Sequence, residues 1–271
     1  MNRIDATFKR LRAEEKKAFI PYVAAGDPDM NTTGKILLAL SEAGADIIEM
    51  GIPFSDPLAD GPTIQKAVQR SLKAGCTVRK VMKMVKTIRR RIETPLVFMT
   101  YYNIVLNYGV SRFVRDAKNI GADGIIVPDL PMEEADELGR EARKNDFCMI
   151  LLTAPTTPAQ RFKKIAAASS GFVYYVSLTG VTGARKTFSG ETKNNVKKVK
   201  RLTSKPVCVG FGISGARQAH DMALLSDGVI VGSAIIGIIE KNLSDKKKMV
   251  RDIGRFARSI AAAVHVKRNH G

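Results

Sequence analysis

Short apolar segments recur along the chain and alternate with stretches in which apolar residues follow helical spacing. Such segments, bounded by Gly, Pro or polar residues, are typical of buried parallel strands. The eight predicted strands are Phe19–Ala24, Ala45–Met50, Pro95–Tyr101, Gly124–Pro128, Cys148–Thr153, Phe172–Ser177, Pro206–Gly210 and Gly228–Gly232. Eight strands alternating with helices predict an α/β protein, a single (β/α)8 TIM barrel with extra helices. A doubly wound sheet also fits the alternation.

The length of 271 residues fits one large α/β domain, so we expect residues 1–271 to form a single barrel domain. The last residues, VKRNHG, match no element, and we expect the tail from about residue 265 to be disordered. No apolar run approaches the roughly 18 residues of a membrane span, and the N-terminus has no apolar signal region. Three cysteines far apart fit neither a zinc site nor a disulfide framework, which predicts a cytoplasmic protein without a metal.

The formal net charge of +18 raises the question of a nucleic-acid partner. Much of the excess lies at helical spacing, however. In residues 78–92 the apolar positions define one face, and most of the Lys and Arg residues lie away from it. No basic segment is interleaved with aromatic residues, as single-strand binders require. We therefore expect no nucleic-acid ligand, and either an anionic substrate or solubility explains the charge.

The segment 47–63, IIEMGIPFSDPLADGPT, contains the strongest candidate chemistry. Glu49 lies near the end of an apolar strand, where an acid is unfavourable unless it is paired or protonated. Asp60 follows eleven residues later in a loop that three prolines stiffen. Two carboxylates in different surroundings suit acid–base chemistry with separated pKa values. The alternative is a strand-end Glu bonded to backbone and a solvated turn Asp.

Two glycine loops follow the last two predicted strands, GFGIS at 210–214 and VGSAI at 231–235. Glycine allows backbone N–H groups to approach an anion, and a helix N-terminus adds its dipole. In barrels these two loops are the usual phosphate site. Tight turns needed only for packing are the alternative. Residues 210–215 also match GxGxxG, but the nearest suitable acid, Asp227, precedes a strand, so a dinucleotide site is disfavoured.

The loop after the sixth predicted strand, residues 177–192, is long for a connection from a strand to a helix and contains three glycines. A mobile lid over the active site has these properties. An ordinary exposed loop is the alternative.

Several motifs, in order along the chain, resemble those of the tryptophan synthase alpha subunit. They are AFIPYVAAGDPD (18–29), GADIIEMGIPFSDPLADGPTIQ (44–65), YYN (101–103), PDLP (128–131), GVTGAR (180–185), GFGIS and VGSAI. The resemblance spans residues 3 to about 260. It implies a cofactor-free lyase of L-tryptophan biosynthesis that cleaves indole-3-glycerol phosphate to indole and glyceraldehyde 3-phosphate. It also implies a pyridoxal-phosphate-dependent beta subunit as partner, in an alpha2beta2 tetramer.

The resemblance assigns roles to individual positions of this sequence. It implies Glu49 as the catalytic acid/base and Asp60 as the acceptor of the indole N–H. The implied phosphate-binding backbone belongs to Gly183, Gly212, Gly232 and Ser233. The implied substrate pocket contains Tyr22, Tyr101, Ile126, Tyr174, Thr182 and Phe211. Contacts with the beta subunit are implied for Pro53 and Asp56. The chain departs from many relatives at Leu178, where a basic residue is common, and at Tyr102, where a small one is.

The residues suit this chemistry. Cleavage of the C–C bond requires protonation of indole C3, stabilisation of positive charge on the ring nitrogen and deprotonation of the side-chain hydroxyl. Apolar neighbours predict a raised pKa for Glu49, while Asp60 in a polar loop can stay ionised. No lysine ends a predicted strand, which disfavours a Schiff-base aldolase. The three histidines, His220, His265 and His270, do not form a metal-binding pattern. A catalytically weak activator subunit and another phosphate-sugar barrel are the competing interpretations.

Overall fold

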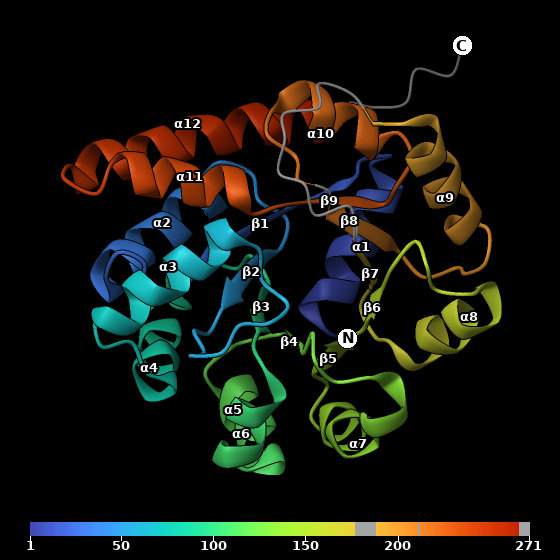
Figure 1. Cartoon of the computed structure of the whole chain (residues 1–271), viewed down its shortest axis with the longest axis horizontal. Coiled ribbons are helices and arrows are strands. Elements are labelled where there is room, and N and C mark those ends of the chain that lie inside the picture. The colour runs from blue at the N-terminus through green and yellow to red at the C-terminus, as the bar shows by residue number, and fades with distance from the viewer. Residues whose placement is uncertain (177–187, 211, 266–271) are drawn as a thin grey trace.

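Parallel strands form the centre of the molecule and helices surround them (Figure 1). The computed structural model describes residues 1–176, 188–210 and 212–265, and the strands within them follow the order β5-β4-β3-β2-β1-β9-β8-β7-β6. Their bounds are β1 Ala18–Ala24, β2 Ile48–Gly51, β3 Leu96–Met99, β4 Gly124–Ile126, β5 Cys148–Ile150, β6 Leu152–Thr153, β7 Val173–Val176, β8 Val207–Gly210 and β9 Gly228–Val231. Every predicted strand is present.

The two ends of this strand order meet, because β5 and β6 are separated only by Leu151. β5 pairs with β4, and β6 pairs with β7. The Leu151 carbonyl accepts the N–H of Tyr174 at 3.1 Å, so the interruption remains bonded to β7. The predicted fifth strand is therefore one extended segment that changes partner at Leu151. The barrel prediction is confirmed, and a doubly wound open sheet is excluded.

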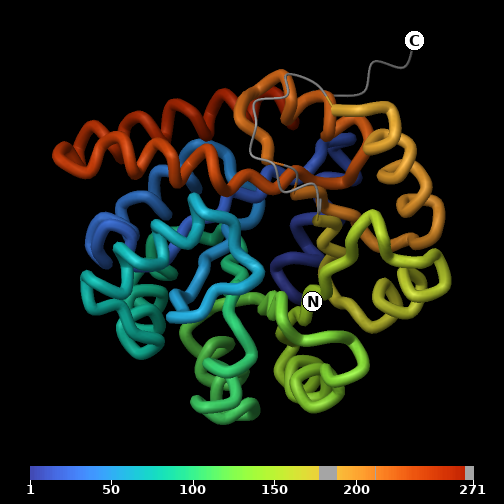
Figure 2. The backbone as a smooth tube through the Cα atoms, in the orientation of Figure 1, coloured from blue at the N-terminus to red at the C-terminus, as the bar shows by residue number. Residues whose placement is uncertain are grey.

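More helices are present than eight strand–helix units need, as predicted. One helix precedes β1, and pairs of helices follow β2, β3 and β9. The bounds are α1 Arg3–Ala13, α2 Met30–Glu42, α3 Pro62–Lys73, α4 Val78–Ile88, α5 Tyr102–Tyr108, α6 Val110–Asn119, η1 Met132–Glu134, α7 Asp136–Lys144, α8 Ala159–Ala168, α9 Gly190–Lys200, α10 Ala216–Ala223, α11 Ser233–Lys241 and α12 Lys246–Val264. The last helix, α12, packs on α2, the helix that follows β1, so the C-terminal part of the chain completes the outer layer beside the first strand–helix unit (Figure 2).

Local sequence explains where these helices begin and which face they bury. The Asp29 carboxylate caps α2 by accepting the N–H of Thr32 at 2.8 Å, and Gly44 turns the chain after α2 with φ +95°. In α4 the predicted apolar face is buried, while Arg79, Lys80, Lys83 and Lys86 are exposed. No helix among the described residues is both long and apolar enough to cross a membrane.

Alternate residues of each strand point into the barrel, where α1 covers the end at which the strands begin. On α1 the side chains of Ile4, Phe8 and Leu11 pack with interior residues such as Phe172 and Ile126. The rings of Phe8 and Phe172 have centroids 5.9 Å apart. Burial of these side chains closes one end of the barrel. Function must therefore use the opposite end, where the strands terminate.

Three buried or half-buried aspartates brace the closed end. Each of them lies one or two residues before a strand: Asp46 before β2, Asp123 before β4 and Asp227 before β9. Each carboxylate accepts a backbone N–H from the neighbouring strand, and the donors, 2.9–3.0 Å away, are Phe19, Leu96 and Val207. Each also pairs with a cation from a helix, and the cations are Arg10 for Asp46, Arg3 for Asp123 and Lys200 for Asp227. These acids are fully engaged in structure.

Candidate active site

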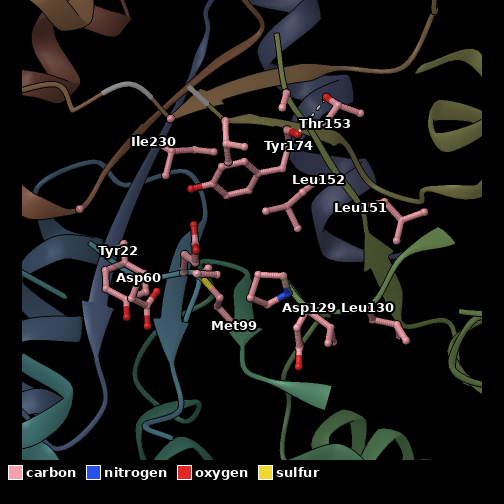
Figure 3. A pocket seen from close by; sticks show the side chains of 18 of the residues that line it. Tyr22, Asp60, Met99, Asp129, Leu130, Leu151, Leu152, Thr153, Tyr174 and Ile230 are labelled. Carbon is pink, nitrogen blue, oxygen red and sulfur yellow. Dashed lines mark hydrogen bonds between the residues drawn. The ribbon is translucent and has the colours of Figure 1, made fainter. Parts of the chain in front are cut away.

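A cavity of about 770 Å³ opens at the carboxyl ends of the strands (Figure 3). Strand ends contribute Tyr22, Glu49 and Tyr174, and the loop after β2 contributes Asp60. A mostly apolar wall faces them, formed by Leu130, Leu151 and Leu152, as Figure 3 shows. The site therefore combines acids and hydroxyls with an apolar surface, as enclosed ligand pockets in proteins do.

Glu49 lies in β2 opposite Tyr22 of β1 and Val97 of β3, and its side chain points into the barrel. The residue is only 1% exposed, and neither carboxyl oxygen has a hydrogen-bond partner among the described residues. Burial, and secondarily the charge of Asp60, raises the pKa of Glu49 to about 8. The carboxyl group is thus mostly protonated at neutral pH. The prediction of a raised pKa for Glu49 is confirmed.

Asp60 is held by the loop that connects β2 to α3. Its backbone N–H donates to the Pro57 carbonyl at 3.1 Å, and the Gln65 amide donates to its carbonyl at 2.8 Å. Burial raises the pKa of the Asp60 carboxyl to about 6, while a hydrogen bond from the Tyr101 hydroxyl opposes this shift. The site is less polar than the sequence suggested. Even so, Asp60 is mostly ionised at pH 7, as predicted, and Glu49 is not.

Two tyrosines lie close to the acids: Tyr22 on β1, beside Glu49 of the paired strand β2, and Tyr174 on β7. Tyr22 and Tyr174 are both buried, and burial together with the nearby carboxyl groups raises the pKa of each phenol well above its usual value. A Cβ atom at Gly51 would lie 2.2 Å from the Tyr22 hydroxyl oxygen, so only glycine leaves room for this ring. A Cβ atom at Gly210 would lie 3.0 Å from the Tyr174 hydroxyl oxygen. Both hydroxyls are therefore neutral and closely confined.

The glycine loops after β8 and β9 meet the same cavity. Gly212, Gly232 and Ser233 line it. α11 begins at Ser233 with Gly232 as its N-cap, so the free N–H groups of its first turn lie at the cavity wall. Gly212 has φ +48°, a left-handed conformation that suits glycine. This wall can accept an anion such as a phosphate group.

Other predicted site residues lie elsewhere. Ile126 packs in the barrel interior below the cavity and does not line it. Tyr101 does not line the cavity either. Its hydroxyl instead accepts the N–H of Ala59 in the loop after β2. Pro53 is buried and Asp56 is exposed. Thr182, Gly183 and Phe211, with Leu178 and most of the predicted lid, lie outside the described residues.

Several cavity residues were not predicted from the sequence. Met99, Leu152 and Ile230 point inward at strand ends, and the period-two alternation of each strand could have identified them. Asp129, by contrast, directly follows the predicted fourth strand, where a barrel places function, and it lines the rim and accepts the N–H of Tyr102. Arg161 reaches the cavity from α8, and no local motif indicates it. Among the described residues, no group of three or more His, Cys, Asp or Glu side chains is arranged to hold a metal ion.

A parallel barrel with two acids in a cavity at the carboxyl ends of its strands defines a (β/α)8-barrel enzyme. Comparison with known proteins identifies the kind. Residues 8–265 match the model of the family described as tryptophan synthase alpha chain. The alpha chain from Caldanaerobacter subterraneus subsp. tengcongensis is 48% identical over 260 residues, which are 96% of this chain and 98% of that one. The Arabidopsis thaliana alpha chain is 43% identical, covering 96% and 95% of the two chains.

Solved structures agree with this result. The tryptophan synthase subunit alpha of Legionella pneumophila has a TM-score of 0.91 at 39% identity, covering 97% of this chain and 98% of that one. A chain of Mycobacterium tuberculosis tryptophan synthase has a TM-score of 0.89 at 37% identity, covering 98% and 99%. The chain belongs to the tryptophan synthase alpha chain family. It is therefore a lyase of tryptophan biosynthesis with a beta chain as its partner, and the resemblance predicted from its motifs is confirmed.

Proposed function

We propose that this chain performs the alpha reaction, the retro-aldol cleavage of indole-3-glycerol phosphate to indole and glyceraldehyde 3-phosphate, with Glu49 and Asp60 as its catalytic residues. One observation carries the assignment of roles. Glu49 is a buried acid without a hydrogen-bond partner among the described residues and has a pKa of about 8, while Asp60 in the same cavity has a pKa of about 6. At neutral pH the first holds a proton and the second a negative charge.

Each role follows from the state of its carboxyl group. Protonated Glu49 gives its proton to C3 of the indole, and positive charge develops on the ring nitrogen. The Asp60 carboxylate accepts the N–H hydrogen bond, which strengthens as the ring becomes cationic. Glu49, now ionised, removes the proton of the side-chain hydroxyl as the C–C bond breaks. Indole and the aldehyde leave, and Glu49 has regained the proton it gave.

The remaining pocket holds the substrate at its two ends. The backbone of Gly212, Gly232 and Ser233, with Gly183, binds the phosphate group, supported by the start of α11 at the cavity wall. Tyr22 and Tyr174 confine the middle of the substrate, as their burial beside Glu49 supports. Ile126 supports the pocket from the barrel interior below it. The family motifs extend the substrate contacts to Thr182 and Phe211.

The partner contact belongs to the loop after β2. Leu58 is 93% exposed on this loop, although a large apolar side chain is normally buried, and exposed Asp56 lies two residues before it. We assign these residues to contact with the beta subunit, a pyridoxal-phosphate enzyme, in an alpha2beta2 tetramer. Pro53 is buried and contributes by shaping the loop. The chain acts in the cytoplasm as a single-domain barrel over residues 1–271.

Direct assay tests this function. The chain is mixed with indole-3-glycerol phosphate, and released indole is followed with and without a beta subunit of the same family. We expect indole release by the chain alone and faster release in the complex. An absence of indole under both conditions would contradict the proposal. The mixtures contain no serine. If indole forms in them only when the beta subunit is added, the chain depends on its partner for catalysis.

A further inference from the structure

Tyr101 was predicted to contact the substrate, but its position indicates a different task. It follows β3 and occupies the N-cap position of α5. The residue is only 6% exposed and does not line the cavity. Its ring packs against Phe54, with centroids 5.3 Å apart. Tyr101 therefore contacts the loop that holds Asp60 and does not itself form the cavity wall.

The Tyr101 hydroxyl bonds the loop directly next to Asp60. It accepts the backbone N–H of Ala59 at 2.9 Å. Its interaction with the neighbouring Asp60 carboxyl lowers the pKa of that group, against the effect of burial. A phenol can accept one hydrogen bond and donate another at the same time. Burial raises the pKa of Tyr101 far above neutrality, so its proton is always available for donation.

The backbone beside Tyr101 is itself fixed. The next residue, Tyr102, donates its N–H to the Asp129 carboxylate, with N–O distances of 2.9 and 3.2 Å. Asp129 belongs to the loop after β4, so the ends of β3 and β4 are tied together next to Tyr101. The Tyr101 hydroxyl thus has a rigid base, as the supporting partner of a catalytic group requires.

We propose that Tyr101 is a positioning residue of the alpha reaction, whose hydroxyl fixes the Ala59–Asp60 segment and so keeps the Asp60 carboxyl group aimed into the cavity. This inference rests on the proposed role of Asp60. Without the hydroxyl, Asp60 loses its donor while remaining partly buried, and the Ala59 N–H loses its acceptor. The neutral form of Asp60 then becomes more stable, and the form that can accept the indole N–H becomes rarer.

The variant Tyr101→Phe removes the hydroxyl and keeps the ring that packs on Phe54. Titration of the Asp60 carboxyl by ¹³C NMR, assigned with Asp60→Asn, should show a midpoint about one pH unit higher than in the wild type, because a hydrogen bond to a charged group is worth roughly this much. The midpoint of the acid limb in the pH profile of kcat/KM should move to a higher pH by the same amount. An unchanged Asp60 midpoint in Tyr101→Phe would overturn the proposal.

Tyr108 provides a matched control, since its hydroxyl donates to the Asp116 carboxylate at 2.9 Å outside the cavity. Tyr108→Phe should leave both the Asp60 midpoint and the acid limb unchanged, and an equal shift in this variant would also overturn the proposal. If Tyr101→Phe raises the Asp60 midpoint but leaves the acid limb in place, Tyr101 does set the ionisation of Asp60. In that case the ionisation of Asp60 does not limit catalysis, and the proposed catalytic role of Asp60 is wrong. The experiment thus separates the role of Tyr101 from that of Asp60.

Discussion

The buried acids at the two ends of the barrel differ in their hydrogen bonding and charge pairing. At the closed end, Asp46 and Asp123 accept backbone N–H groups and pair with arginines of α1. At the open end, Glu49 is equally buried, yet both of its oxygens lack a partner among the described residues. Asp60 lies between these extremes, with one hydroxyl donor and a raised pKa. Burial alone therefore does not distinguish the structural acids from those proposed to be catalytic, but hydrogen bonding does.

The physical reason lies in what each acid must do. A carboxylate that receives several donors is stabilised in its charged form and is poorly suited to release or take up protons near neutral pH. A buried carboxyl without donors keeps its proton to a higher pH and can transfer it. The unpartnered carboxyl at the open end therefore lowers the stability of the fold but leaves the group reactive, as is common at functional sites. Substitutions at the two ends should separate these roles.

The largest expected effect is on Glu49. Glu49→Gln keeps the shape and the neutral charge of the protonated acid but cannot transfer a proton, so kcat for indole release should fall by at least about 10³-fold. The circular dichroism spectrum should remain that of the wild type. Retained turnover in a folded Glu49→Gln protein would remove Glu49 from the mechanism.

Asp123 should show the reverse behaviour. Asp123→Asn leaves the half-buried Arg89 without its carboxylate and weakens the bond to Leu96, so the free energy of unfolding should fall by about 3–5 kcal/mol. The value of kcat per folded molecule should stay within about twofold of wild type. Because the sequence contains no tryptophan, urea unfolding is best followed by circular dichroism. A large loss of kcat without loss of stability would contradict the division between the two ends.

A smaller effect is expected for Asp60. Asp60→Asn keeps an acceptor oxygen but loses the charge that balances the cationic ring, so kcat should fall by about 10²-fold. A phosphate-bearing substrate analogue should still bind with nearly wild-type affinity, which isothermal titration calorimetry can measure. If analogue binding disappears as well, Asp60 supports the structure of the loop rather than the chemistry.

The smallest change is a change of pH, which requires no substitution. The pH dependence of kcat/KM should show the ionisation of both Asp60 and Glu49. Asp60 must be ionised, so activity should fall as the pH drops below about 6. Glu49 must be protonated for the first step, so activity should also fall as the pH rises above about 8. A bell-shaped profile with these limits is expected from steady-state assays between pH 5 and 9 or so. A profile that stays flat above pH 8 would contradict the role of Glu49 as an acid.

Much of the fold could be predicted from the sequence, because apolar segments and their punctuation record which residues are buried. The interruption at Leu151 could not be predicted, since the pattern of Cys148–Thr153 continues through it and only the two partner strands differ. The start of a helix is harder to predict to the residue. A serine after a strand is a typical N-cap, but Ser233 is the first residue of α11 and Gly232 is its cap.

The site was predictable where a residue type is costly for its place, as with Glu49 in an apolar strand. The task of Tyr101 was not, because it depends on which way a hydroxyl points in three dimensions and on a loop more than 40 residues earlier in the chain. Arg161 likewise reaches the cavity only because separate strand–helix units meet at one rim. Such contacts leave no trace in local spacing.

The protonation state of Glu49 decides whether this residue can be the proton donor. Titration of its carboxyl carbon by ¹³C NMR in the folded chain, assigned with Glu49→Gln, reports that state without reference to activity. We expect a midpoint near pH 8, as an unpartnered buried acid beside Asp60 should have. A midpoint below pH 5 would mean that Glu49 is ionised at neutral pH and would contradict its role as the proton donor.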